Sequence, residues 1–179
     1  MFRVLLIVAY HLGLRRSELA HLRWSAVDFN RNVLHVEGTA SAGERTKNRK
    51  VRTLPMPLIV QDELRSLYQS VPLFVERGQS KPKHPHCFTW ENGDPLLPDW
   101  ITHEFARVAK RSKIEHCSIH DLRRSFSTLA QRAGVDKVTV KDLGGWSTVQ
   151  VLEKHYTGET PEVFRRAMRV IEASKQASA

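Results

Sequence analysis

The chain has 179 residues, of which 41% are hydrophobic, and it carries a formal net charge of +9. This length is sufficient for one well-buried domain and requires no second one, and the charge fits either a nucleic-acid partner or a merely basic surface. Two cysteines, Cys87 and Cys117, are too few for a disulfide framework, which suits a reducing cytoplasm, and the apolar residues 1–14 are too short for a membrane span and lack the marks of a signal peptide.

The N-terminal part of the chain predicts two helices in succession. Residues 2–12 are apolar on most sides, which indicates a buried helix, and Gly13 is a suitable residue to end it. A second helix is expected over residues 17–24, with the hydroxyl of Ser17 as its N-terminal cap. This helix should direct two leucines into the core: Leu19 and Leu22.

A small sheet and a third helix are expected next. Residues 33–38 and 51–56 are rich in β-branched side chains, so they predict two antiparallel strands joined by an exposed polar turn. Residues 57–71 predict a helix, and residues 78–86 have the composition of a surface loop. The apolar positions of that helix recur at helical spacing: Val60, Leu64, Leu67 and Val71.

From Pro98 onward the chain reads as helices. Gly134 should end one of them, Asp136 should cap the next, and Ser147 should cap a short helix that ends near Tyr156. Two apolar stripes define the earlier helices of this part: Ile101, Phe105 and Val108 in one, and Leu122, Phe126 and Leu129 in the other.

The last helix is expected to begin at Thr160-Pro161-Glu162, which supplies a cap, a first-turn proline and a first-turn acid. Its apolar stripe consists of Phe164, Met168 and Ile171. The predicted fold class is therefore α+β and mostly helical, with a small antiparallel sheet beside a helical core.

Four residues carry groups that together suit the cutting of a phosphodiester without a metal ion. Arg15 lies in GLRRSEL, His120 and Arg123 in HDLRRSF, and Tyr156 ends LEKHY. A tyrosine nucleophile requires removal of its proton and stabilisation of charge on the phosphoryl oxygens. Guanidiniums stabilise that charge well because their planar forks match two oxygens at once, and the spacing of His120 and Arg123 places both on one helical face.

These motifs give the chain its resemblance to a known family. GLRRSEL, TKNRKVRTLP, HDLRRSFST and LGGW…HY occur in the order and near the spacing typical of the catalytic domain of tyrosine recombinases, the phage integrase family. The resemblance implies that residues 1–179 form one catalytic domain with that family's fold. It also implies that the helical DNA-clamping domain that usually precedes it is absent from these residues, as in a fragment or a naturally short member.

The resemblance assigns roles to the four residues. Arg15 and Arg123 correspond to the two catalytic arginines, His120 to the acid/base residue, and Tyr156 to the nucleophile that forms a 3′-phosphotyrosine link. His120 could accept the phenol proton or, as imidazolium, stabilise phosphate charge. Glu18, one turn from Arg15, is expected to orient one of the arginines.

Two more site residues are implied, each with an alternative. Lys47 fits the hairpin lysine that protonates the departing 5′ oxygen, with Lys50 as its rival and a solvated basic turn as the alternative. Trp146 stands where many members have a histidine, so it should donate a hydrogen bond rather than transfer a proton, unless it is simply a core residue. Tyr156 follows Trp146 by ten residues, one more than in many members.

The implied function is that of a site-specific DNA recombinase or integrase that acts on double-stranded DNA. The family assembles as a homotetramer on paired sites, and the isolated domain is expected to be a monomer. Segment 160–175 would dock on a neighbouring protomer or pack on its own core. Neither cofactor nor metal is expected, because the loop with His84, His86 and Cys87 lacks a fuller ligand set.

Three alternatives stay open at this point. A type IB topoisomerase-like enzyme would nick and close DNA with the same chemistry, a catalytically inactive DNA-binding regulator would not cut it, and a metal-dependent nuclease would stop on chelation. Intact Arg15, His120, Arg123 and Tyr156 argue against the regulator. The resemblance implies a cytoplasmic protein, bacterial or phage-encoded and nucleoid-associated, and leaves open its target sequence and whether it integrates, moves, inverts or resolves DNA.

Overall fold

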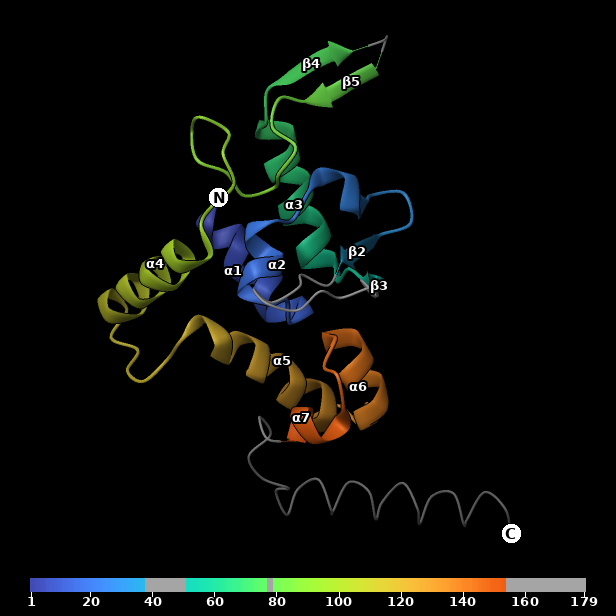
Figure 1. The fold of residues 1–179 in the computed structure, drawn as a ribbon, viewed down its shortest axis with the longest axis vertical. Coiled ribbons are helices and arrows are strands. Elements are labelled where there is room, and N and C mark those ends of the chain that lie inside the picture. The colour runs from blue at the N-terminus through green and yellow to red at the C-terminus, as the bar shows by residue number, and fades with distance from the viewer. Residues whose placement is uncertain (38–50, 77–78, 154–179) are drawn as a thin grey trace.

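A computed structural model describes residues 1–37, 51–76 and 79–153, in which a small antiparallel sheet lies at one side of a mostly helical body (Figure 1). The described helices are α1 (Phe2–Leu12), α2 (Arg16–Ala20), the 3-10 turn η1 (Trp24–Ala26), α3 (Leu58–Ser70), α4 (Pro98–Arg111), α5 (Ile119–Arg132), α6 (Lys137–Gly144) and α7 (Val149–Glu153). The strands are β1 (Val27–Asp28), β2 (Val33–Glu37), β3 (Val51–Pro55), β4 (Leu73–Glu76) and β5 (Gln79–Pro82). Within these described ranges, none of the helices has the length and apolar character needed to cross a membrane.

Helix α1 forms the centre of the core, as its apolar sequence predicts. It contacts α3 and α5, and full burial of each large aliphatic side chain contributes about 1.5–3 kcal/mol. Gly13 ends the helix in the left-handed conformation with φ 62°, and its N–H donates to the carbonyl of Ala9 at 3.0 Å. A Cβ at Gly13 would lie 2.5 Å from the ring of Phe126, so only glycine lets α5 approach this corner closely.

The main sheet has the order β1-β2-β3, and both of its strand pairs are antiparallel. The two predicted strands are confirmed as β2 and β3, and the two-residue strand β1 is an addition that the sequence pattern did not indicate. Leu34 pairs with Leu54, and Val36 pairs with Arg52. Because side chains alternate along a strand, Arg52 lies on the same inward face of β3 as the buried Leu54.

Two predicted helix starts are wrong by one or two residues. Arg15, not Ser17, occupies the N-cap position of α2, which ends at Ala20 rather than extending over 17–24. Thr148, not Ser147, caps α7, because its hydroxyl accepts the N–H of Val151 at 3.2 Å. The cap of α6 is as predicted: the carboxylate of Asp136 accepts the N–H of Thr139 at 2.9 Å.

The segment predicted as a surface loop over 78–86 contributes strand β5 of a hairpin with β4. This hairpin projects beyond the end of α3 (Figure 1, top), and every residue of β4 is exposed. The sequence pattern fails here because neither face of the hairpin is buried, so the strands show no inside–outside alternation.

Helix α4 buries Ile101 and Phe105 as predicted, but the buried face of α5 is offset from the predicted stripe. Leu129 is 44% exposed, and the most buried positions of α5 are Ile119, Arg123 and Ser127. A polar face of α5 therefore lies against the body of the protein, and this face contains Arg123.

Candidate active site

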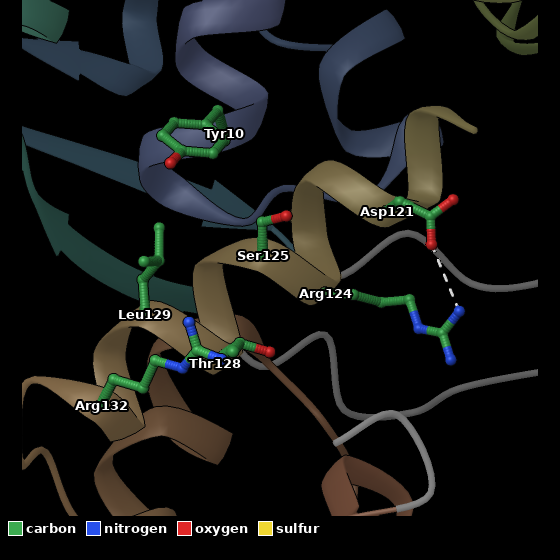
Figure 2. Close-up of a pocket in the computed structure, with 7 residues that line it drawn as sticks. All are labelled: Tyr10, Asp121, Arg124, Ser125, Thr128, Leu129 and Arg132. Carbon is green, nitrogen blue, oxygen red and sulfur yellow. Dashed lines mark hydrogen bonds and ion pairs between the residues drawn. The ribbon is translucent and has the colours of Figure 1, made fainter. Parts of the chain in front are cut away.

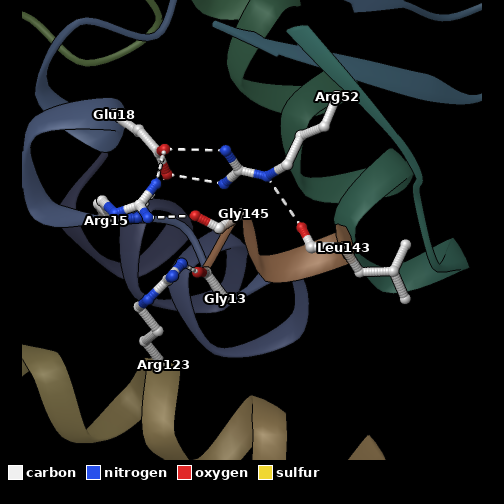
Figure 3. A network of polar contacts seen from close by, with 7 residues as sticks. All are labelled: Gly13, Arg15, Glu18, Arg52, Arg123, Leu143 and Gly145. Atoms are coloured by element: carbon white, nitrogen blue, oxygen red, sulfur yellow. Dashed lines mark hydrogen bonds and ion pairs between the residues drawn. The ribbon is translucent and has the colours of Figure 1, made fainter. Parts of the chain in front are cut away.

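A buried carboxylate organises the polar centre of the molecule. The side chain of Glu18 has no exposed surface and accepts four hydrogen bonds from two arginines (Figure 3). Arg15 donates its backbone N–H at 2.7 Å and Nη1 at 2.9 Å. Arg52 donates Nη1 at 2.9 Å and Nη2 at 2.8 Å to the two carboxylate oxygens. The expected orienting contact between Glu18 and Arg15 is thus present, and Arg52 is an additional partner.

Local structure explains why Glu18 lies here. It is the third residue of α2, where its carboxylate accepts the N–H of Arg15 and satisfies a backbone donor that the helix leaves unpaired. Burial acts to raise the pKa of Glu18, but hydrogen bonding and charge from Arg52, followed by those from Arg15, outweigh it and lower the pKa. Glu18 is therefore ionised at neutral pH.

The same arginines bind carbonyls at the end of α6. Nε of Arg52 donates to the carbonyl of Leu143 at 2.9 Å, and Nη2 of Arg15 donates to the carbonyl of Gly145. The loop that contains Gly144-Gly145-Trp146 is thereby held against α2 and β3, as Figure 3 shows.

Arg123 reaches the same place from α5. It is only 2% exposed, it donates Nη1 to the carbonyl of Gly13, and its guanidinium carbon lies 3.9 Å from the centre of the Trp146 ring. Burial, and to a lesser extent the charge of Arg15, lowers the pKa of Arg123 to about 9, although Glu18 opposes the shift. Arg123 remains protonated at neutral pH, and the stacked indole partly offsets the desolvation of its charge.

The charge balance of this cluster is positive. Among the described residues that form it, three guanidiniums face the single carboxylate of Glu18. The side chain of Arg15 is 38% exposed, so an anion can approach from solvent. Each arginine has five N–H donors in a rigid fork, and Arg15 and Arg123 each retain donors beyond the bonds given above. The arrangement suits an oxyanion with several acceptor oxygens, such as a phosphodiester.

Trp146 is buried with Val140 and Leu152 in a second apolar cluster, against Phe126. Gly144 lies directly beside the indole, and a side chain at Gly144 would overlap the ring. Trp146 is therefore a core residue that also supports a site arginine, and hydrogen-bond donation from its indole N–H to a phosphate stays a prediction.

Three of the six predicted site residues come together in the structure: Arg15, Arg123 and Trp146. His120 is exposed in the first turn of α5, three residues before Arg123. Lys47, its rival Lys50, and Tyr156 lie outside the described residues.

Sequence reasoning missed Arg52. The one available signal was its position in β3, where strand alternation places a charged residue on the inward face beside Leu54. A charge at such a position needs a buried partner, and Glu18 is that partner.

A separate cavity of about 370 Å³ lies elsewhere on α5 (Figure 2). Its lining is polar and includes the ion pair between Asp121 and Arg124 at 3.2 Å, but none of the residues of the arginine cluster. Within the described ranges, no group of three or more His, Cys, Asp or Glu side chains is arranged to hold a metal ion. Cys87, from the HPHC stretch, is buried in the core, where burial raises the pKa of its thiol.

Gly145→Ala should destabilise the protein by about 2–3 kcal/mol, because the left-handed backbone is strained with a side chain and the new Cβ displaces Arg52. Gly145 has φ 70°, and a Cβ there would lie 2.8 Å from Nη1 of Arg52. The matched control is Gly134→Ala, which has φ 90° but nothing within 4 Å of the added carbon. Urea unfolding should give a loss of only about 1 kcal/mol for Gly134→Ala, and equal losses would contradict the predicted contact.

Glu18→Gln should destabilise the protein at neutral pH by about 3 kcal/mol, since it leaves two arginines without a buried countercharge. The pKa of Glu18 in the folded protein lies below the ordinary glutamate value of 4.5, so the stabilisation by Glu18 is fully present above pH 4.5 and is lost as pH falls through the folded-state pKa. Chemical unfolding between neutral and acid pH should show the gap between the wild type and Glu18→Gln closing below about pH 4.5. A gap that stays constant down to the acid limit would contradict this.

The chain is similar to known proteins over most of its length. The model of the phage integrase family matches residues 2–162. A tyrosine recombinase XerC-like protein of Caldanaerobacter subterraneus is 24% identical over 94% of this chain and 48% of its own length, and tyrosine recombinase XerA of Thermococcus onnurineus is 29% identical over 92% and 53%. The integrase of transposon Tn1549, solved with circular intermediate DNA, superposes with a TM-score of 0.72 at 22% identity, over 94% of this chain and 59% of that one. The chain thus spans about half the length of the curated relatives it matches.

Proposed function

The chain belongs to the phage integrase family of tyrosine recombinases, and from this premise we propose that it cuts and rejoins DNA in site-specific recombination through a 3′-phosphotyrosine intermediate. The observation that carries the proposal is the convergence of Arg15 and Arg123 beside the buried carboxylate of Glu18. This cluster has an excess of positive charge, and Arg15 gives it access to solvent. A scissile phosphate is the ligand that this charge and geometry suit best.

In the proposed reaction the phenolic oxygen of Tyr156 attacks the scissile phosphorus. The O–P bond to tyrosine forms as the P–O5′ bond breaks, so the energy of the phosphodiester is conserved and no external energy source is needed. Arg15 and Arg123 stabilise the charge that develops on the non-bridging oxygens. Attack by a 5′-hydroxyl of a partner strand on the phosphotyrosine then completes the exchange.

Two protons move in this scheme. The phenol proton goes to a base, for which His120 is the candidate, and the departing 5′ oxygen takes a proton from Lys47, with Lys50 as the alternative donor. Trp146 supports Arg123 by stacking and can donate its indole N–H to a phosphoryl oxygen, but it cannot transfer a proton.

The proposed partner is double-stranded DNA. Solved relatives include the Tn1549 integrase in complex with circular intermediate DNA and a lambda integrase dimer bound to a core site. For this chain we propose four protomers on two DNA sites in the active assembly and a cytoplasmic, nucleoid-associated location. The segment 160–175, proposed to dock on a neighbouring protomer or on its own core, lies outside the described residues.

The test is a nicked suicide substrate, which lets the 5′ end diffuse away and traps the protein on DNA. A covalent adduct that survives denaturant should form in the presence of a metal chelator. Cutting that leaves no adduct and that stops on chelation would instead support a metal-dependent nuclease. Relaxation of supercoiled DNA without joining of two cognate sites would support the topoisomerase-like alternative, and DNA binding without any adduct would support an inactive regulator.

A further inference from the structure

We propose that Arg52 is a positioning residue of this site, which fixes Glu18 so that Arg15 stays free to bind the phosphate. The inference rests on the proposed function where the rate of adduct formation is measured. The effect of Arg52 on Glu18 can be measured without DNA. Arg52 lies within the motif TKNRKVRTLP, but the role predicted from that motif belongs to Lys47 or Lys50 and none is assigned to Arg52.

The contacts of Arg52 hold its guanidinium in one orientation. Two of its nitrogens bind the two oxygens of Glu18 at 2.9 and 2.8 Å, and its third nitrogen, Nε, donates to the carbonyl of Leu143 at 2.9 Å. Its side chain is only 12% exposed. A planar fork held on all three nitrogens has little remaining rotational freedom, and lysine cannot reproduce this geometry.

Arg52 and Arg15 both donate hydrogen bonds to the carboxylate of Glu18. Oε1 of Glu18 accepts from Nη1 of both arginines. Without Arg52, Glu18 would be free to form a bidentate pair with Arg15 and would neutralise it. The donors of Arg15 that an incoming phosphate needs would then be used internally. Arg52 thus keeps the positive charge of Arg15 available.

Exposure separates the two roles. The side chain of Arg15 is 38% exposed and can be reached from solvent, whereas that of Arg52 is 12% exposed and is held beside Glu18 by two hydrogen bonds (Figure 3). Arg52 therefore acts through Glu18 and Arg15 and does not touch the phosphate itself.

Arg52 also joins three separate parts of the chain. It lies on β3, binds Glu18 of α2, and binds Leu143 at the end of α6. A second hydrogen bond holds the same end of α6, because the carbonyl of Gly145 accepts from Nη2 of Arg15. The loop that precedes Trp146 is thereby held in register with both arginines.

The catalytic test compares Arg52→Lys with Arg65→Lys under single-turnover conditions at saturating suicide substrate. Arg65 is a matched control because it is exposed and lies over the Phe29 ring at 5.0 Å, outside the cluster. Arg52→Lys should slow adduct formation by about 10- to 100-fold, because a small misplacement of a phosphate-binding group is costly. DNA affinity should change by less than about threefold, since the scissile phosphate is one of the many phosphates whose contacts together dominate the affinity of DNA-binding proteins. Arg65→Lys should cut as the wild type does.

A double-mutant cycle separates positioning from general destabilisation. If Arg52 acts through Glu18, the rate loss of Arg52→Lys combined with Glu18→Gln should be no larger than that of Glu18→Gln alone. Multiplicative rate losses, or an Arg52→Lys enzyme that cuts at the wild-type rate, would overturn the proposal.

The second measurement needs no activity. Arg52 is the largest cause that lowers the pKa of Glu18, against burial, which raises it. In Arg52→Met the midpoint of the Glu18 carboxyl, followed by NMR of labelled glutamate, should therefore move to higher pH. An unchanged midpoint would overturn the role of Arg52 even if the wild type formed no DNA adduct, and the lack of an adduct alone would refute only the proposed function.

Discussion

Replacing Tyr156 by phenylalanine should abolish the covalent protein–DNA adduct, with a loss of at least about 10⁴-fold in the rate of its formation, because no other atom can replace the attacking phenolic oxygen. The measurement is denaturing electrophoresis of the labelled suicide substrate over a time course. The substitution removes one hydroxyl and keeps the ring, so the fold and the arginine cluster should be unaffected.

The other two tyrosines supply matched controls. Tyr68 packs edge-on against Trp24 with ring centres 5.0 Å apart, and Tyr10 lies on α1 beside His11. Tyr10→Phe and Tyr68→Phe should each leave adduct formation within about twofold of the wild type, as expected for changes away from the reacting atoms. An adduct that persists in Tyr156→Phe but disappears in one of the controls would identify that other tyrosine as the nucleophile and overturn the assignment.

The elements that sequence predicted correctly are those whose hydrophobic pattern matches the surface they bury. Helix α3 is an example, since Val60 and Leu64 are fully buried at helical spacing. The hairpin of β4 and β5 was missed because its strands bury neither face. Leu129 was misplaced because the most buried positions of α5 are Ile119, Arg123 and Ser127, so the buried face is offset from the apolar stripe that ends at Leu129.

The site shows the same division between local and long-range information. The pairing of Glu18 with Arg15 follows from their spacing of three residues, so local reasoning suffices. The bond between Arg52 and Glu18 joins residues 34 apart in sequence, and nothing near Arg52 distinguishes it from the neighbouring basic residues except its inward position on β3. Long-range pairings of this kind are set by tertiary packing, which a local pattern does not encode.

Arg123→Met should separate stability from catalysis. Methionine can fill the space beside Trp146 without bringing a charge into the core, and the pKa of Arg123, lowered to about 9, means that the fold disfavours its protonated form. A basic group whose pKa is lower in the folded state than in the unfolded state destabilises the fold at neutral pH, because it must stay protonated there. Replacing Arg123 by an uncharged residue removes this cost. Arg123→Met should therefore unfold with a free energy at least as large as that of the wild type, or at most about 1 kcal/mol smaller.

Adduct formation by Arg123→Met should nevertheless fall by about 10²- to 10³-fold, the usual effect of removing one charged donor from a developing oxyanion. Arg124→Met is the matched control, because Arg124 occupies the next position on α5 but pairs with Asp121 away from the cluster. A variant at Arg123 that unfolds more easily and loses activity in proportion would make the residue a structural one. Stable folding together with slow cutting would instead mean that the chain tolerates a buried, costly charge because the scissile phosphate neutralises it when DNA binds.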